Sequence, residues 1–395
     1  MGAITLGSKP QSTPGGNAAP AAQPAIPFTR AARMKSNVAY QTGNTTLTTS
    51  SQPLPPIQIP AAGYLASLEL LVTVTSTGNA ATVALQADAP WTVFNQVSLV
   101  NSAGDNIITP LTGYQLYLVN KYGNFRGQPP FIDPKRDPAY TALTTGAAAT
   151  AGSGAFRLFI PVEIDPSQAF CALPNLAANK SYLLQFQLNA LSSTYSTAPN
   201  GTVTLSIQII AHYWSQPAAA NAAGVPQQTA PTGVGSVSLW QLETIPVTAG
   251  DRIVQLHNVG NVMREIIFVL RTAAGARTSA DWPALSQILL NNDLLFYKPT
   301  AAWLGGMAES FGYDTGAIDA AGGLDTGVFV LYDFMSPENG LCSPSSMRDQ
   351  YLPTLDATLL QFRGTNFGAS ASTLEVVSNA IKPISAAALY EPHVR

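Results

Sequence analysis

The dominant pattern along this chain is the short run of alternating apolar and polar residues that predicts β-strands. In residues 203–212, VTLSIQIIAH, every second side chain is apolar, as expected for a strand with one face in a core. Residues 156–164, FRLFIPVEI, and 182–188, YLLQFQL, alternate in the same way. Gly, Pro and Asn separate such runs. The same reasoning predicts strands at residues 68–75, 93–100, 237–244, 251–256, 265–271, 287–290, 328–334, 358–362 and 373–377.

Helical patterns are few, and both follow a predicted strand closely. Residues 111–122 place apolar side chains on one stripe, and Gly123 follows as a C-terminal stop. Residues 301–311 space Trp303, Met307 and Phe311 four apart, which also places them on one helical face. The chain is therefore predicted to be all-β with two short inserted helices.

The second half of the chain repeats the first half in order. The strand around Glu69 has a counterpart around Glu265, at an offset of 196 residues, and the tetrapeptide LLQF at 183–186 recurs at 359–362. Further matches in the same order join Trp91 to Trp282, Gln96 to Gln287, Val97 to Ile288, Leu99 to Leu290, Asn101 to Asn292, Tyr122 to Tyr313, Pro166 to Pro337, Cys171 to Cys342, Thr204 to Thr373, Leu205 to Leu374 and Ile207 to Val376. The offset changes only between elements, where loops vary in length, and this predicts a tandem duplication.

The duplication divides the chain into four segments. Residues 1–36 are expected to form a flexible basic arm, 37–214 a first jelly roll, 215–236 a linker and 237–395 a second jelly roll. The linker has no charged residue and is mostly Ala, Pro, Gly, Gln and Thr. Each copy holds around eight short strands, so two tandem eight-stranded jelly rolls fit best. An immunoglobulin-like sandwich would be shorter and would lack the helix.

Charged residues make up only 10% of the chain, with 19 Lys and Arg against 22 Asp and Glu, where soluble proteins carry roughly 25%. Such a surface suits a protein in contact with copies of itself, and an uncharged secreted domain is the alternative. The composition excludes a wholly disordered chain and a dedicated nucleic-acid binder. Two cysteines are too few for a disulfide scaffold, and no run approaches the roughly 18 apolar residues of a membrane span.

The start of the chain is basic, because no acidic residue precedes Glu69. A mobile basic arm on an acidic body can reach anionic lipid head groups or packaged nucleic acid, and a merely solubilising tail is the alternative. The candidate residues for a membrane or shell-interior contact are Lys9, Arg30, Arg33 and Lys35.

No catalytic, cofactor-binding or metal site is expected, and the chain is not expected to be an enzyme. Asp133 and Asp137 share their loop with Lys135 and Arg136, which favours an ion-paired loop over a catalytic carboxylate pair. The sequence has no G-x-S-x-G elbow and no P-loop. None of the three histidines has a second His or a Cys at metal-ligand spacing; they are His212, His257 and His393.

The chain resembles the double jelly-roll major capsid proteins of tailless icosahedral phages with an internal membrane. The features that carry this resemblance are the duplicated blocks, the linker at 215–236 and the basic arm, all within 395 residues. The same lineage includes adenovirus hexons. The resemblance covers residues 37–395. It implies a homotrimer whose six jelly rolls form a pseudo-hexagonal tile of a virion, made in the host cytoplasm. The implied partners are neighbouring trimers, penton or minor capsid proteins and, through the arm, an internal lipid membrane; sequence-specific nucleic acid is not among them.

The resemblance also implies that loops carry outward-facing or tile-facing variation, with residues 125–153, 272–282 and 314–325 as candidates. Two other functions remain open. A phage spike or tandem carbohydrate-binding module would need aromatic side chains clustered on one loop face. A secreted double jelly-roll hydrolase would need an export signal and a cluster of acids between the two domains.

Overall fold

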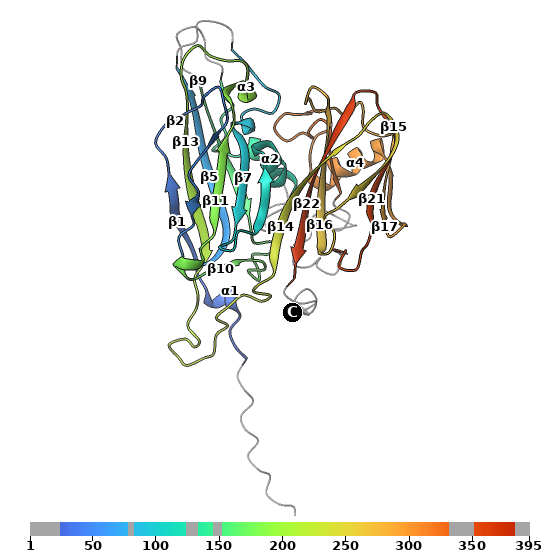
Figure 1. The fold of residues 1–395 in the computed structure, drawn as a ribbon. Coiled ribbons are helices and arrows are strands. Elements are labelled where there is room, and N and C mark those ends of the chain that lie inside the picture. The colour runs from blue at the N-terminus through green and yellow to red at the C-terminus, as the bar shows by residue number, and fades with distance from the viewer. Residues whose placement is uncertain (1–23, 78–82, 124–132, 145–151, 332–350, 384–395) are drawn as a thin grey trace, which may run out of the picture.

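The computed structural model describes residues 24–77, 83–123, 133–144, 152–331 and 351–383. These residues form two β-rich lobes that stand side by side, with their long strands running along the same direction (Figure 1). The first half of the chain builds one lobe and the second half builds the other. Each lobe contains two facing antiparallel sheets.

The outer sheet of the first lobe has the antiparallel order β1-β13-β5-β9. Along β13 the buried and partly exposed residues alternate without interruption, so the sequence pattern correctly indicated one face in the core. Two short strands, β2 and β10, extend this sheet. The strands are β1 (Met34–Gln41), β2 (Thr45–Thr46), β5 (Gly63–Ser76), β9 (Gly152–Pro161), β10 (Leu173–Asn175) and β13 (Val203–Trp214).

The second sheet of the first lobe places β11 between β7 and the short strands β3 and β4, and β8 forms its other edge. A separate two-stranded pair, β6 with β12, lies beside this lobe's core. The strands are β3 (Gln52–Pro53), β4 (Ile57–Gln58), β6 (Ala84–Leu85), β7 (Phe94–Val100), β8 (Asn106–Leu111), β11 (Leu183–Leu188) and β12 (Tyr195–Thr197).

The second lobe repeats both strand orders, as β14-β22-β16-β19 and β15-β21-β17-β18. The short strand β20 also pairs with β16. The strands are β14 (Val237–Pro246), β15 (Gly250–Leu256), β16 (Val262–Thr272), β17 (Leu285–Leu290), β18 (Asp293–Pro299), β19 (Val328–Leu331), β20 (Leu352–Pro353), β21 (Leu360–Phe367) and β22 (Ala371–Lys382).

Matched residues in the described strands also occupy equivalent places in the sheets, whereas Pro337 and Cys342 lie outside the described residues. In the first lobe Glu69 pairs with Ile210, and in the second Glu265 pairs with Asn379. The offset that matches Leu205 to Leu374 also matches Ile210 to Asn379. Likewise, the pair Leu99–Leu184 corresponds to Leu290–Leu360. The lobes therefore share strand order and register, as a duplication predicts.

Helices are short and sit at equivalent points of the two lobes. Helix α2 (Gly113–Tyr122) follows β8, and α4 (Thr300–Phe311) follows its counterpart β18, which confirms both predicted helices. Thr112 starts α2 with a capping box, because its hydroxyl accepts from the Gln115 N–H at 3.2 Å. The remaining helical turns are α1 (Phe28–Ala31), α3 (Leu191–Thr194), η1 (Trp91–Val93), η2 (Pro134–Arg136) and η3 (Ala178–Lys180).

The two lobes meet edge to edge through one parallel bridge, in which Trp240 on β14 pairs with Ile108 on β8. This bridge joins a sheet of the first lobe to a sheet of the second. In the combined order, β19-β16-β22-β14 from the second half precede β8-β7-β11-β3 from the first half. The strands of the two halves are therefore adjacent without being interleaved.

Part of the expected N-terminal arm belongs to the first lobe. Helix α1 buries Phe28, which is 2% exposed and packs edge-on against Tyr64 at 5.2 Å. Strand β1 begins at Met34 and pairs with Trp214. Residues 28–36, expected to be flexible, are therefore held by aromatic burial and by a β-ladder.

Candidate functional site: the contact between the two lobes

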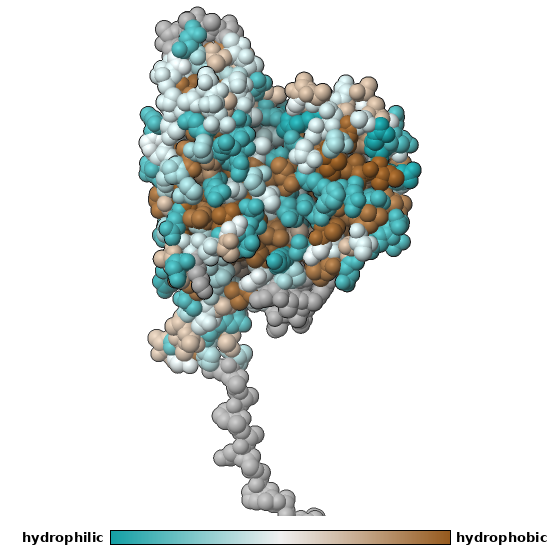
Figure 2. All heavy atoms as spheres, in the orientation of Figure 1, coloured by the Kyte–Doolittle hydropathy of each residue, from teal (hydrophilic) through white to brown (hydrophobic). Residues whose placement is uncertain are grey.

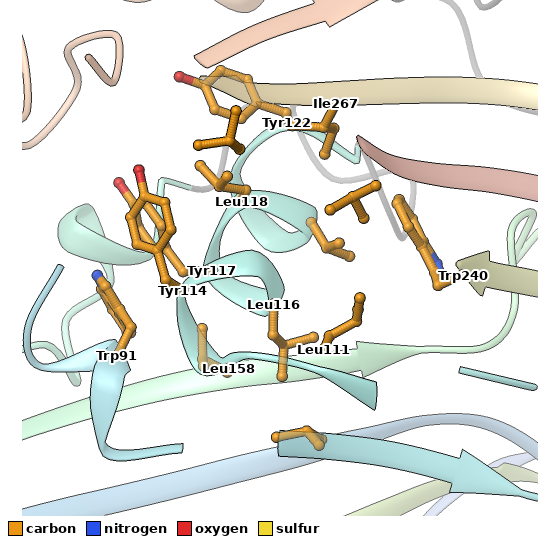
Figure 3. Close-up of a cluster of buried hydrophobic side chains, with 14 of the residues drawn as sticks. Trp91, Leu111, Tyr114, Leu116, Tyr117, Leu118, Tyr122, Leu158, Trp240 and Ile267 are labelled. Atoms are coloured by element: carbon orange, nitrogen blue, oxygen red, sulfur yellow. The ribbon is translucent and has the colours of Figure 1, made fainter. Parts of the chain in front are cut away.

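Helix α2 fills the space between the lobes. All of its residues except Asn120 are buried, although the helix belongs to the first lobe. Its side chains lie between Trp91 and Leu158 of the first lobe on one side and Trp240 and Ile267 of the second lobe on the other (Figure 3). One hydrophobic core therefore runs through both lobes.

A buried ion pair crosses this contact at the end of α2. The ammonium group of Lys121 lies 2.6 Å from Asp325 Oδ2, and both side chains are almost completely buried. Lys121 also donates to the Gly323 carbonyl at 2.6 Å and to the Tyr117 hydroxyl at 3.3 Å. Tyr122 donates to the same Asp325 oxygen at 2.9 Å. Each ammonium proton has an acceptor, which is the condition for a stable buried pair.

Tyrosines surround this pair and remain protonated. Burial raises the pKa of Tyr117 and of Tyr122 far above the usual range, and the Asp325 carboxylate raises both further. Burial also raises the pKa of Tyr313, followed by the charges of Asp133 and Asp325. The Tyr313 hydroxyl donates to the Lys121 carbonyl at 2.9 Å. These hydroxyls therefore act as hydrogen-bond donors that hold the two lobes together.

The loop containing Asp133 and Lys135 contacts the second lobe instead of facing outward. Gly322 donates its backbone N–H to Asp133 Oδ2 at 2.6 Å, and Lys135 donates to the Asp319 carbonyl at 2.6 Å. Gly322 has a φ of +80°, and a Cβ there would clash with the Arg136 guanidinium. Parts of the predicted variable loops 125–153 and 314–325 therefore contact the neighbouring lobe, while residues 125–132 and 145–151 lie outside the described residues. Asp137 is ion-paired, as expected for this loop, but its partner is Arg157 on β9 and not Lys135 or Arg136.

Two arginines of the second lobe donate hydrogen bonds to one carboxylate of the first lobe. Asp88 accepts from Arg271 at 2.9 Å and from Arg277 at 2.7 Å. Arg271 also binds Glu375 at 2.7 Å, and both guanidinium groups lie within 5.5 Å of the Tyr114 ring centre on α2. Residues 272–282, expected among the variable loops, therefore contribute Arg277 to the contact.

A second buried pair lies where the end of α2 meets β16. Arg264 donates to the carbonyl of Gly123, the C-cap residue of α2, at 3.0 Å and to Glu265 Oε2 at 3.0 Å. Glu265 is fully buried, and its other oxygen has no hydrogen-bond partner. Burial raises the pKa of Glu265 to about 7, although the Arg264 charge lowers it in part.

The hydrolase alternative requires a cluster of acids between the two lobes, and carboxylates do lie there. Their partners do not favour catalysis. Asp88 forms an ion pair with Arg271, and Asp325 forms one with Lys121, both at hydrogen-bond distance. An open groove of about 350 Å³ lies elsewhere on the first lobe, and no carboxylate lines it. Its lining residues are Pro53, Leu54, Pro56, Gln96, Gln185, Phe186 and Gln187. Within the described ranges, no three His, Cys, Asp or Glu side chains gather as metal ligands would.

The basic residues expected to contact a membrane or shell interior lie at one end of the first lobe, where Figure 1 places α1 and the start of β1. Arg30 is in α1, Arg33 follows it, and Lys35 is an exposed residue of β1. None of these three forms an ion pair with another described residue. Lys9 lies outside the described residues. Among the helices that the structure describes, none combines the length and apolar character needed to cross a bilayer.

Sequence comparisons give no relatives, since the chain matches no protein-family model and no curated protein. Solved structures do match. The major capsid protein of Sulfolobus Turreted Icosahedral Virus superposes with a TM-score of 0.59 at 12% identity, covering 89% of this chain and 97% of that one. The capsid of the virus PBCV-1 superposes with a TM-score of 0.55 at 12% identity, covering 89% and 93%. The chain thus has the double jelly-roll fold of these capsid proteins, as its sequence predicted.

Proposed function

We propose that this chain is the major structural protein of an icosahedral viral shell. The observation that carries the proposal is the match of nearly the whole chain, 89% of it, to nearly the whole of a viral major capsid protein, 97%. Shared fold alone does not determine function. Here the low charge and the carboxylates neutralised between the lobes also favour a structural role over a catalytic one.

The capsid subunit proposed here is a homotrimer. Two lobes with the same strand order stand side by side in one chain (Figure 1). Three such chains place six similar lobes in a ring, whose near-hexagonal outline tiles a surface. Neighbouring trimers, and penton or minor capsid proteins at the vertices, would complete the shell. The protein would be made in the host cytoplasm and reside in the virion.

Light scattering coupled to size-exclusion chromatography tests this function. We expect a particle of three times the 41.4 kDa chain mass, and electron micrographs of the trimer should show a near-hexagonal outline. A protein that stays monomeric at the highest concentration it tolerates would contradict the proposal.

The end of the first lobe that carries Arg30, Arg33 and Lys35 is proposed to face the shell interior and its lipid membrane, together with Lys9. Support comes from the three placed cations, which have no anionic partner among the described residues and can therefore interact with lipid phosphates.

Charge reversal tests this orientation. The triple variant Arg30→Glu, Arg33→Glu, Lys35→Glu should lose most of its flotation with vesicles that contain anionic lipid, because three attractive charges become repulsive. The matched control is Arg252→Glu, an exposed cation of the second lobe, which should float like the unmodified protein. Equal flotation of the triple variant and the control would place the membrane contact elsewhere.

A further inference from the structure

Three side chains on the solvent-facing side of the outer sheet of the first lobe form a hydrogen-bonded row. They are Ser36 on β1, His212 on β13 and Glu69 on β5. The Ser36 Oγ lies 2.8 Å from His212 Nδ1, and His212 Nε2 lies 3.0 Å from Glu69 Oε2. A hydroxyl, an imidazole and a carboxylate in this order, each within hydrogen-bond distance of the next, form the arrangement that activates a serine as a nucleophile.

The antiparallel ladder brings these three residues together. Ser36 stands directly opposite His212, and Glu69 lies on β5 two residues from the position opposite His212. The Arg33 carbonyl accepts from the Ser215 N–H at 2.8 Å, so these two residues are a hydrogen-bonded pair. Three positions further, Ser36 and His212 are therefore a non-hydrogen-bonded pair, whose side chains stand closer together. Ser36 and His212 are 176 residues apart in the sequence, so no local motif marks the row.

The carboxylate determines which nitrogen of the imidazole carries the proton. Glu69 also accepts from Arg157 at 3.0 Å. The hydrogen bond from His212 and the charge of Arg157 lower the pKa of Glu69, although partial burial opposes them. Glu69 is therefore ionised at neutral pH and accepts a hydrogen bond from the N–H at Nε2 of His212. This leaves Nδ1 as the acceptor for the Ser36 O–H, so the imidazole is held in the tautomer that can take the serine proton.

The nucleophile is open to solvent, whereas the base and the carboxylate are partly covered. Ser36 is exposed, and the side chains of His212 and Glu69 are 15% and 12% exposed. A small molecule can therefore reach the hydroxyl. Partial exclusion of water from the other two groups strengthens the contact between them.

The backbone at Ser36 supplies a hydrogen-bond donor beside the hydroxyl. Because Ser36 and His212 are a non-hydrogen-bonded pair, the Ser36 N–H points away from β13, and in the part of the chain that the structure describes β1 pairs only with β13. In serine hydrolases the N–H of the nucleophilic serine is one of the donors that stabilise the negative oxygen of the tetrahedral intermediate. The Ser36 N–H is in the same position relative to its own hydroxyl.

Apolar side chains flank the Ser36 hydroxyl along β1. Met34 and Val38 stand two residues before and after it, so the alternation of a strand places all three on one face. They are 49% and 56% exposed. On the side of the first lobe where Figure 1 places β1, Figure 2 shows only small apolar patches among polar residues. Patches of this size suit contact with a short acyl chain.

We propose that Ser36 is an activated nucleophile that cleaves small carboxylic esters with an apolar acyl group, with His212 as the general base and Glu69 as its positioning residue. The Ser36 oxygen attacks the ester carbonyl carbon while its proton passes to His212 Nδ1. The bond from that carbon to the alcohol oxygen then breaks, His212 returns the proton to the departing alcohol, and an acyl-serine remains. Water attacks the acyl-serine with the same base, which releases the carboxylic acid and restores Ser36. This reactivity goes beyond the proposed shell function and lies apart from the carboxylates between the lobes.

Labelling with an alkyl fluorophosphonate tests the nucleophile. The serine oxygen displaces fluoride from phosphorus, and mass spectrometry of the digested protein locates the adduct. We expect the adduct at Ser36, with a labelling rate that falls by roughly 100-fold or more in His212→Gln, which keeps a polar side chain but removes the base. Ser196 is the internal control, because it is an exposed strand serine whose hydroxyl donates to the Leu85 carbonyl at 3.3 Å. It should remain unlabelled.

Two further variants separate positioning from binding, with the rate of Ser36→Ala subtracted as background. Glu69→Gln should lower kcat for para-nitrophenyl butyrate by about 10-fold or more and leave KM unchanged, because it removes the charge that orients His212 without touching the ester. The double variant Met34→Gln, Val38→Thr should instead raise KM for the butyrate by roughly fivefold relative to the acetate, because it removes apolar contacts with the acyl chain. Its Ser36 labelling should be retained.

Absence of an adduct at Ser36 in the unmodified protein would refute the proposal. An adduct that forms as fast in His212→Gln, or on Ser196 as readily as on Ser36, would also refute it, because Ser36 would then be an ordinary exposed hydroxyl. Glu69→Gln gives an independent measure should His212→Gln fail to fold, and an unchanged kcat in that variant would exclude the role of the carboxylate. None of these outcomes alters the light-scattering test of the shell function.

Discussion

Replacing Asp325 by Ala is expected to lower the free energy of unfolding by about 3–5 kcal/mol. The Lys121 ammonium would remain buried at the contact of the lobes, with only the Gly323 carbonyl and the Tyr117 hydroxyl as acceptors. An uncompensated buried charge costs far more than the loss of an exposed ion pair. Denaturant unfolding followed by intrinsic tryptophan fluorescence measures the change, since Trp91, Trp240 and Trp303 are all buried.

Two controls separate the buried charge from a general effect of mutation. The double variant Lys121→Met, Asp325→Leu removes both charges and should recover most of the lost free energy, because apolar replacement of a whole pair is often neutral or stabilising. Asp105→Ala, at an exposed carboxylate, should change the free energy by less than about 0.5 kcal/mol. A loss below about 1 kcal/mol in Asp325→Ala would contradict the buried pair.

The strands that could be predicted are those with one face in a core. β13 alternates along its whole length, β5 and β16 contain the apolar runs LLV and IIFVL, and β22 has mostly apolar and β-branched residues at 373–377, so the sequence located all four. Every predicted strand overlaps an observed one, although residues 332–334 of the segment 328–334 lie outside the described residues.

The strands that sequence reasoning missed are mostly edges. β18, DLLFYKP, has consecutive apolar residues of which most are exposed, and β8, NIITPL, contains Pro110. β1, MKSNVAYQ, is mostly polar and lies in and just after the segment assigned to the arm. An edge strand obtains part of its order from its ladder and its neighbours rather than from a buried face, so its own sequence carries a weak pattern.

The contact between the lobes was only partly accessible from the sequence. Lys121 is the one charged residue of the mostly apolar helix α2, and Glu265 stands in the run VMREIIFVL, so a charge in a mostly apolar element was a usable signal for both. Their partners were not predictable, because Lys121 and Asp325 are 204 residues apart. The expectation of a variable loop at residues 314–325 did not include this contact, for the same reason. Those residues are polar and Gly-rich as surface loops are, and only the tertiary fold brings them against α2.

Glu69 and Glu265 occupy equivalent positions in the two lobes, but their pKa values shift in opposite directions. A hydrogen bond from His212 and the charge of Arg157 lower the pKa of Glu69, although partial burial opposes them. Burial against α2 instead raises the pKa of Glu265 to about 7, with Arg264 lowering it in part. The same residue in the same register is therefore stabilised as a carboxylate in one lobe and destabilised as a carboxylate in the other.

This difference predicts a pH dependence specific to Glu265. Between its unfolded pKa of 4.5 and its folded pKa of about 7, the folded protein keeps a proton that the unfolded chain releases. The free energy of unfolding should therefore fall as pH rises through this window, by about 3 kcal/mol in total. Glu265→Gln, which cannot ionise, should remove this fall. Urea unfolding of both proteins at pH 5, 6, 7 and 8 measures it.

Glu69→Gln is the matched control, because it makes the same change at the equivalent position. Since the folded pKa of Glu69 is lowered, its contribution is present above the unfolded pKa and is lost only as pH falls below about 4.5. Between pH 5 and 8 this variant should keep the slope of the unmodified protein, whatever its constant offset. If Glu265→Gln also kept that slope, the Glu265 side chain would have to be hydrated or fully neutralised by Arg264 in the folded state. The lobe contact would then be open to water at the end of α2.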